Sequence, residues 1–142
     1  MAAAGDLPDS VIGLGIDTIE IARIREAMQS RSGERFERRV FTPQEIAYCR
    51  SRPDPFPHFA ARFAAKEAGM KALGTGWTAE VFWQGLEIVR DRMGKPLLQL
   101  NGKTAEFAAA AGVVSGHVSL SHDRERAVAV VILSAGKKTG GV

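Results

Sequence analysis

The spacing of apolar residues divides the first half of the chain into one strand and three helices. Residues 11–17 (VIGLGID) alternate as in a strand, with Asp17 on the side of the glycines. The other side of this strand consists of Ile12, Leu14 and Ile16. Residues 18–30 have helical spacing, and residues 42–50 begin with the capping-box pattern Thr-Pro-x-Glu. A third helix is expected over residues 58–73, which are rich in Ala and are followed by Gly-Thr-Gly.

The second half of the chain has the pattern of two hairpins separated by one helix. The expected elements are strands over 81–90 and 96–100, a helix over 104–112, and strands over 115–122 and 127–133. The three prolines of residues 51–57 (SRPDPFP) predict a loop. The order β-α-α-α-ββ-α-ββ predicts an α+β fold, in which helices pack on a largely antiparallel sheet.

The Ala-rich helix carries charges on two sides. Successive helical residues turn by about 100°, so Arg62 and Lys66 share one side and Glu67 and Lys71 share the nearly opposite side. An ordinary surface helix has one wet face, and this pattern predicts two. The many small residues between the charges would let another backbone or a ligand come close to the helix.

The basic residues are concentrated in one segment. The net charge is +3, and residues 23–39 contain six arginines and three glutamates, which equals the whole surplus. Such a segment attracts nucleic acid, an anionic membrane or an acidic protein, or it is a solvated helix face with internal ion pairs.

Several classes of site and location are disfavoured by composition. Cys49 is the only cysteine, which excludes a disulfide framework and a cysteine zinc site and favours a reducing cytoplasm. The sequence lacks an apolar run that could span a membrane and lacks a signal-peptide pattern. We expect a flexible leader over residues 1–10, a single domain over 11–134 and a flexible tail over 135–142.

Three separated elements remain as candidates for chemistry, and each also has an ordinary structural interpretation. Asp17 could cap the following helix, Glu67 and Lys71 could form an i,i+4 ion pair, and His122 could be a turn histidine. Taken together, two carboxylates with a cation nearby suit Mg²⁺, which completes its shell with water and phosphate oxygens. Lysine and histidine could then hold the remaining phosphate charge.

The motifs at these positions resemble a known family. GLGIDTIEIARI, FTPQE, RFAAKEAGMKALGTG, GKP and HVSLSHD occur in the order seen in holo-[acyl-carrier-protein] synthases, the small type of 4′-phosphopantetheinyl transferase. The resemblance extends over about residues 11–133. It implies Mg²⁺-dependent transfer of the phosphopantetheine arm from coenzyme A to a serine of an acidic apo acyl carrier protein, with release of 3′,5′-ADP. It also implies a homotrimer whose active site lies in the cleft between protomers.

The resemblance also implies roles for individual residues. The metal-binding positions match Asp17 and Glu67. The positions that bind or polarise the coenzyme A phosphates match Arg62, Lys71 and His122. The basic face that receives the carrier matches Arg23, Arg31 and Arg35. Asp17, Glu67 and Lys71 would act in catalysis, and the group that takes the serine proton could be Glu67, a metal-held water or a substrate phosphate.

The chain departs from the family pattern in three places. It has the leader, and Thr18 stands where a branched apolar residue is common. Gly85-Leu86 replaces the usual Asp-Ile, which could alter a trimer contact or be neutral drift. Two rival functions remain: a nucleic-acid binder that uses residues 23–39, and a non-catalytic oligomerisation domain in which the Ala-rich helix is an interface. The first leaves Asp17 and Glu67 unexplained and has Phe36 as the only aromatic residue in the basic segment.

Overall fold

The computed structural model describes residues 11–76, 78 and 80–136. The elements are β1 (Val11–Glu20), α1 (Ile21–Gln29), α2 (Gly33–Val40), α3 (Pro43–Arg50), α4 (Pro55–Leu73), the 3-10 turn η1 (Trp83–Gly85), β2 (Leu86–Arg90), β3 (Pro96–Leu100), α5 (Gly102–Ala110), β4 (Ser115–His122) and β5 (Arg126–Ser134). The predicted leader and residues 137–142 of the predicted tail lie outside the described residues. None of the described helices is long and apolar enough to cross a membrane.

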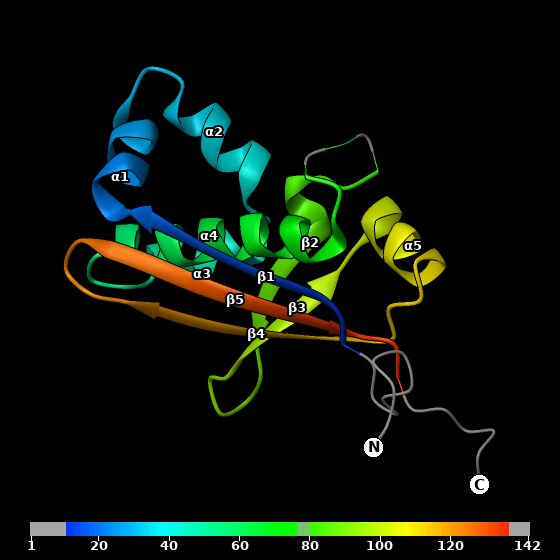
Figure 1. Cartoon of the computed structure of the whole chain (residues 1–142). Coiled ribbons are helices and arrows are strands. Elements are labelled where there is room, and N and C mark those ends of the chain that lie inside the picture. The colour runs from blue at the N-terminus through cyan, green and yellow to red at the C-terminus, as the bar shows by residue number, and fades with distance from the viewer. Residues whose placement is uncertain (1–10, 77, 79, 137–142) are drawn as a thin grey trace, which may run out of the picture.

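Two antiparallel sheets form the β part of the fold. One has the strand order β1-β5-β4, and the other is the hairpin β2-β3. Helix α4 lies across one face of the three-stranded sheet, and α1 and α2 lie together near one end of it (Figure 1). The predicted α+β class and the antiparallel pairing are therefore confirmed.

Small residues bring α4 unusually close to β1. A Cβ atom on Gly15 would lie 1.8 Å from the carbonyl oxygen of Ala68, and one on Gly13 would lie 2.1 Å from that of Ala72. Only glycine therefore fits at these two positions of β1. The small residues of α4 thus serve the contact with the sheet, and this contact places Asp17 of β1 beside the exposed side chains of the helix.

The opposite face of the same sheet is apolar and exposed. Leu14 and Ile16 of β1 are 64% and 60% exposed, and they pair across the ladder with Ile132 and Val130 of β5. The alternation predicted for residues 11–17 is confirmed, and its apolar side is the one that faces away from α4. An exposed apolar surface on a sheet typically marks a contact with another chain.

Some predicted boundaries are wrong for local reasons. Helix α2 is absent from the predicted elements, because the segment GERFERRV is mostly charged and its helical signal is limited to two apolar residues one turn apart, Phe36 and Val40. Helix α4 begins at Pro55 inside the predicted loop, because prolines fit in the first turn of a helix and the Asp54 side chain accepts a hydrogen bond from the Phe56 amide at 3.2 Å. The strand expected from residue 81 begins at Leu86, after η1.

Candidate active site

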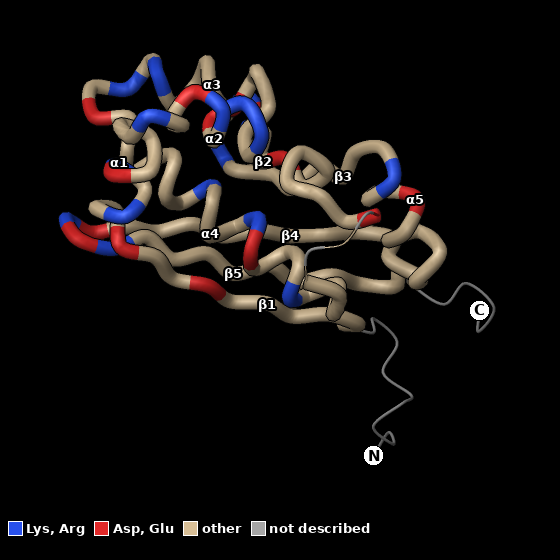
Figure 2. The backbone as a smooth tube through the Cα atoms, turned by 90° about the horizontal axis from the view of Figure 1, so that it is seen from above, with Lys and Arg blue, Asp and Glu red and all other residues tan. Residues whose placement is uncertain are grey.

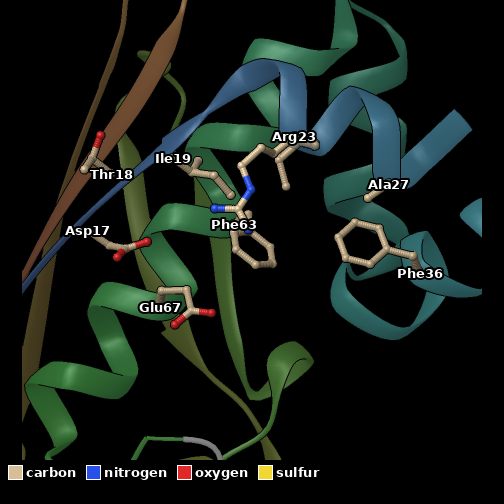
Figure 3. Close-up of a pocket in the computed structure, with 9 residues that line it drawn as sticks. Asp17, Thr18, Ile19, Arg23, Ala27, Phe36, Phe63 and Glu67 are labelled. Atoms are coloured by element: carbon tan, nitrogen blue, oxygen red, sulfur yellow. The ribbon is translucent and has the colours of Figure 1, made fainter. Parts of the chain in front are cut away.

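Two carboxylates from different elements share one pocket. Asp17 lies on β1 and Glu67 on α4, and the pocket between β1, α1, α2 and α4 has a volume of about 450 Å³. Figure 3 shows both carboxylates on the same side of this pocket, with Arg23 reaching in from α1. The lining residues are Asp17, Thr18, Ile19, Arg23, Ile24, Ala27, Phe36, Phe63 and Glu67. We call this space the carboxylate pocket.

Lys71 lies next to the pocket and is paired with Asp17. Its Nζ is 3.1 Å from Asp17 Oδ1 and donates to the carbonyl oxygen of Ile16 at 3.0 Å. Asp17 is a strand residue, and Glu20 stands at the N-cap of α1, so the interpretation of Asp17 as a helix cap is wrong. The ion pair that the structure forms at this point is Lys71–Asp17, between two elements, and not the i,i+4 pair within the helix.

The electrostatics of the pocket suit a divalent cation. Partial burial, and then the neighbouring charge of Asp17, raise the pKa of Glu67 above its ordinary value, while Lys71 opposes the shift. Two anions that repel each other are stabilised together by a cation between them. No cluster of three or more metal-ligating His, Cys, Asp or Glu side chains occurs in the part of the chain that the structure describes. Two carboxylates with open positions are the donor set that Mg²⁺ uses when phosphate oxygens complete its shell.

Apart from Thr18 and Arg23, the residues that line the rest of the carboxylate pocket are apolar, which the sequence does not predict. Phe36 of α2 and Phe63 of α4 lie side by side, with ring centroids 6.1 Å apart, and Ile24 of α1 is buried beside them. The place of Phe63 four residues before Glu67, one helical turn away, was the available signal. Phe36 lies in the basic segment, and only the fold brings it to the pocket.

The second charged side of the Ala-rich helix is not wet. Lys66 is fully buried, and its Nζ lies 2.8 Å from Glu45 Oε1 and donates to the carbonyl oxygens of Leu86 at 2.6 Å and Trp83 at 3.0 Å. Arg62 is 3% exposed. The prediction of two solvated sides is therefore wrong. Lys66 can be buried because one carboxylate and two carbonyls satisfy its three protons.

We expect Lys66→Ala to lower the free energy of unfolding by about 3–5 kcal/mol, because it leaves the carboxylate of Glu45 buried without its counter-charge. Lys103→Ala, at an exposed position of α5, is the matched control and should change stability by less than about 0.5 kcal/mol. Urea unfolding of both variants measures the difference. A loss below 1 kcal/mol for Lys66→Ala would contradict the assigned pair.

Arg62 and His122 belong to a second cluster. The Arg62 guanidinium lies 4.5 Å from the centre of the Tyr48 ring and donates to the carbonyl oxygen of His58 at 3.3 Å. Its buried Nε has no hydrogen-bond partner among the described residues. His122 ends β4, as predicted, and its ring centroid lies 5.6 Å from that of His58. Burial, and then the charges of Arg62 and His122, lower the pKa of His58, which favours the neutral form of its ring.

The two clusters line different pockets of one chain. His122 lines a pocket of about 500 Å³ together with Arg25 and Arg124, whereas Asp17 and Glu67 line the carboxylate pocket. The structure thus brings Asp17, Glu67, Lys71 and Arg23 together, and it places Arg62 and His122 elsewhere.

The remaining predicted residues, Arg31 and Arg35, lie on a third surface. They line a depression of about 560 Å³ along α2. Its lining residues are Arg31, Ser32, Glu34, Arg35, Arg38 and Arg39. Figure 2 shows Lys and Arg positions gathered over α1, α2 and the turn between them. We call this depression the basic groove. Arg23 is separate from it and lines the carboxylate pocket.

Comparisons with known proteins agree with this geometry. A family model described as the 4′-phosphopantetheinyl transferase superfamily matches residues 13–131. The holo-[acyl-carrier-protein] synthase of Koribacter versatilis is 46% identical over 123 residues, which cover 87% of this chain and 98% of that protein. The chain belongs to the holo-[acyl-carrier-protein] synthase family. It is accordingly a member of a family of transferases.

Solved structures of family members have the same fold. The holo-[acyl-carrier-protein] synthase of Neisseria meningitidis superposes with a TM-score of 0.81 at 29% identity, covering 87% of this chain and 98% of that one. The enzyme of Helicobacter pylori, solved in complex with coenzyme A, superposes with a TM-score of 0.76 at 33% identity. That match covers 85% of this chain and 99% of the Helicobacter pylori chain.

The departure from the holo-[acyl-carrier-protein] synthase pattern at Gly85 has a packing explanation inside the chain. A Cβ atom at residue 85 would lie 2.0 Å from the Oγ1 atom of Thr104. That hydroxyl accepts a hydrogen bond from the Phe82 amide at 3.3 Å and donates to the carbonyl oxygen of Glu80 at 3.0 Å. Gly85 therefore makes room for Thr104, which ties α5 to the segment before β2.

Proposed function

We propose that this protein transfers the 4′-phosphopantetheine arm of coenzyme A to a serine of an acidic apo acyl carrier protein. The reaction would require Mg²⁺ and release 3′,5′-ADP. The observation that carries the proposal is that Asp17 and Glu67 line one pocket, with Lys71 paired to Asp17 beside it, in a chain of this family. The coenzyme A bound to the Helicobacter pylori relative supports the choice of donor.

The residues of the pocket have complementary roles in this proposal. Asp17 and Glu67 would hold Mg²⁺, which when bound neutralises charge on the pyrophosphate. The serine oxygen attacks the phosphorus that carries the pantetheine arm, and the serine proton passes to Glu67, a metal-held water or a substrate phosphate. The bond from that phosphorus to 3′,5′-ADP breaks with its electron pair on the leaving phosphate. Lys71, released from Asp17, would stabilise the negative charge on this leaving group. Catalysis then rests on positioning and charge stabilisation.

This chemistry is tested by analysis of the nucleotide product. Incubation with coenzyme A, Mg²⁺ and a panel of apo carriers should give 3′,5′-ADP in amounts equal to the modified carrier. A metal chelator should stop its formation, and Mg²⁺ in excess should restore it. Equal formation of 3′,5′-ADP with and without the chelator would contradict the metal requirement.

The two clusters and the exposed sheet face support a homotrimer with a shared active site. The apolar face around Leu14 and Ile16 provides the contact surface. Within one chain, the phosphate-binding candidates Arg62 and His122 do not reach the carboxylate pocket. A neighbouring protomer would supply His122 to the cleft, with Arg62, which is 3% exposed, in the same cluster. Coenzyme A would then lie between Lys71 of one protomer and His122 of its neighbour.

The basic groove is proposed to steer an acidic carrier toward the carboxylate pocket. Exposed charges add little stability but raise encounter rates, and salt screens them with a Debye length of about 8 Å at physiological ionic strength. Arg35→Glu should therefore raise the KM for the carrier several-fold and leave the KM for coenzyme A nearly unchanged. Added salt should weaken the wild type more than the variant, because the variant has less attraction left to screen.

Arg23→Glu should raise the carrier KM as well, but it also places a third carboxylate beside Asp17 and Glu67, so Arg35→Glu is the cleaner test. Arg92→Glu, on the exposed turn between β2 and β3, makes the same charge change away from the groove and serves as control. If Arg23→Glu and Arg35→Glu both kept wild-type carrier kinetics and salt dependence, as the control should, the carrier would have to dock elsewhere.

A further inference from the structure

The side chain of Gln84 in η1 caps the C-terminal end of α2. Its Nε2 donates to the carbonyl oxygens of Arg38 at 2.5 Å and Phe41 at 3.0 Å, which lie 46 and 43 residues earlier in the chain. The last carbonyls of a helix have no partners within the helix and must find them elsewhere. The end of α2 is thus fastened by a segment that is distant in the sequence.

The neighbouring Trp83 supports α2 from a second direction. Its ring stacks on Phe63 of α4, with centroids 5.1 Å apart and planes at 25°. Phe63 in turn lies 6.1 Å from Phe36 of α2. A row of three aromatic rings therefore runs from η1 through α4 to α2, and it ends at the wall of the carboxylate pocket.

The turn that provides both contacts is itself firmly held. The carbonyl oxygen of Trp83 accepts from buried Lys66 at 3.0 Å, and that of Gln84 accepts from Asn101 Nδ2 at 3.0 Å. Gly85 packs against Thr104 with no room for a side chain. The turn η1 is therefore well anchored and can position helix α2, which is held less firmly.

Helix α2 depends on such outside contacts. It has eight residues, of which Gly33 and Val40 are buried, and its main packing partners are α1 and η1. A polar helix of two turns is not stable alone in water. Its exposed arginines, which include Arg35 and Arg38, line the basic groove, so any displacement of α2 displaces the groove.

We propose that η1 positions the carrier-docking surface, with Gln84 as the positioning residue that sets α2, and with it Arg35 and Arg38, relative to the carboxylate pocket. The inference rests on the proposed docking of an acidic carrier in the basic groove. Gln84 is not among the residues that line the carboxylate pocket or the basic groove. Its effect on the reaction is carried by the helix it caps, because a preformed surface binds a partner without the cost of ordering it first.

Steady-state kinetics of Gln84→Ala test the proposal. Loss of the two hydrogen bonds should raise the KM for an acidic apo carrier about three- to tenfold. The KM for coenzyme A and kcat at saturating carrier should stay within about twofold, because the carboxylate pocket keeps its residues. The Gln84→Glu side chain has nearly the same shape but offers no donor to the two carbonyls. This variant should therefore also raise the carrier KM and leave the coenzyme A KM and kcat nearly unchanged.

Gln99→Ala is the matched control. Its amide donates to Glu87 at 3.3 Å and Asn101 at 3.1 Å on the same hairpin and makes no hydrogen bond to α2. It should therefore leave the carrier KM unchanged. Amide hydrogen exchange gives a second readout: exchange at the α2 amides should quicken in Gln84→Ala and stay at the wild-type rate in Gln99→Ala, while α4 is unaffected in both.

The outcomes distinguish the positioning role of Gln84 from the docking role of the basic groove. If Arg35→Glu raises the carrier KM and Gln84→Ala does not, the positioning role is wrong and the docking surface stands. If Gln84→Ala and Gln99→Ala raise the carrier KM equally, the effect is a general loss of stability and the positioning role is again wrong. If Arg35→Glu has no effect, the basic groove does not receive the carrier, and the proposal falls with it.

Discussion

Asp17→Asn and Glu67→Gln should each lower phosphopantetheine transfer by at least about 10²–10³-fold while the fold is retained. Each substitution replaces a proposed anionic metal ligand of the carboxylate pocket by a neutral amide of nearly the same shape. The remaining carboxylate and the substrate phosphates would hold a hard divalent cation more weakly than two carboxylates do. Initial rates over a titration of Mg²⁺ measure the effect, which higher Mg²⁺ should rescue only in part.

Denaturant unfolding shows whether a loss of activity comes from the changed carboxylate or from misfolding. Glu67→Gln should unfold at the same denaturant concentration as the wild type or slightly above it, because burial and the charge of Asp17 already disfavour the ionised Glu67 and raise its pKa. Asp17→Asn loses only a partly exposed pair with Lys71, worth about 0–1 kcal/mol. Glu106→Gln on the exposed side of α5 is the control and should be fully active. Wild-type rates in both pocket variants at limiting Mg²⁺ would contradict the assignment of Asp17 and Glu67 as metal ligands.

The second large effect is expected from the exposed sheet face. Leu14→Asp combined with Ile16→Asp should convert the proposed trimer to monomers and abolish activity, because charges would replace the apolar surface that we propose as the contact between protomers. Met93→Asp is the matched control, since Met93 is 91% exposed on the turn between β2 and β3, and it should leave assembly unchanged. Light scattering recorded with the rate measures both properties. A wild-type protein that is monomeric and fully active at nanomolar concentration would exclude the trimer.

Mixed trimers test whether two protomers share the site. Asp17→Asn damages the carboxylate pocket and His122→Ala damages the second cluster, so an unfolded and refolded mixture should regain activity at interfaces that combine the two intact halves. A mixture of Asp17→Asn with Glu67→Gln should gain nothing, because both substitutions lie in the same pocket. Equal activity of the two mixtures would show that each chain holds a complete site.

Local signals in the sequence predicted the elements whose stabilising contacts are local. The capping box of Thr42 and Glu45 is present, and α4 ends at Gly74, which has φ of 76°. Helix α2 is absent from the prediction because its segment is mostly charged, and its position could not be predicted because Gln84 and the aromatic row adjoin it only in the folded chain. The predicted start of α4, at residue 58, is too late because the prediction treats proline as a helix breaker, although the first turn of a helix tolerates it.

The candidate site was predicted in part for the same reason. Asp17, Glu67 and Lys71 stood out because charged residues on an apolar background have few ordinary explanations. Helical spacing separated Lys66 from Glu67 correctly, but it could not show that Lys66 is buried, since its partner Glu45 lies on another helix. The pairing of Lys71 with Asp17 depends on the close approach of α4 to β1, which the glycines of β1 permit.

We propose that this protein modifies a carrier serine through the pocket of Asp17 and Glu67. The most direct test of this proposal is the mass of an acidic apo acyl carrier protein after incubation with coenzyme A, Mg²⁺ and the protein. The carrier should gain the mass of one phosphopantetheine arm with the wild type, and it should gain nothing with Asp17→Asn or when its own acceptor serine is replaced by alanine. An unchanged carrier mass with the wild type, or an equal gain with Asp17→Asn, would contradict the account.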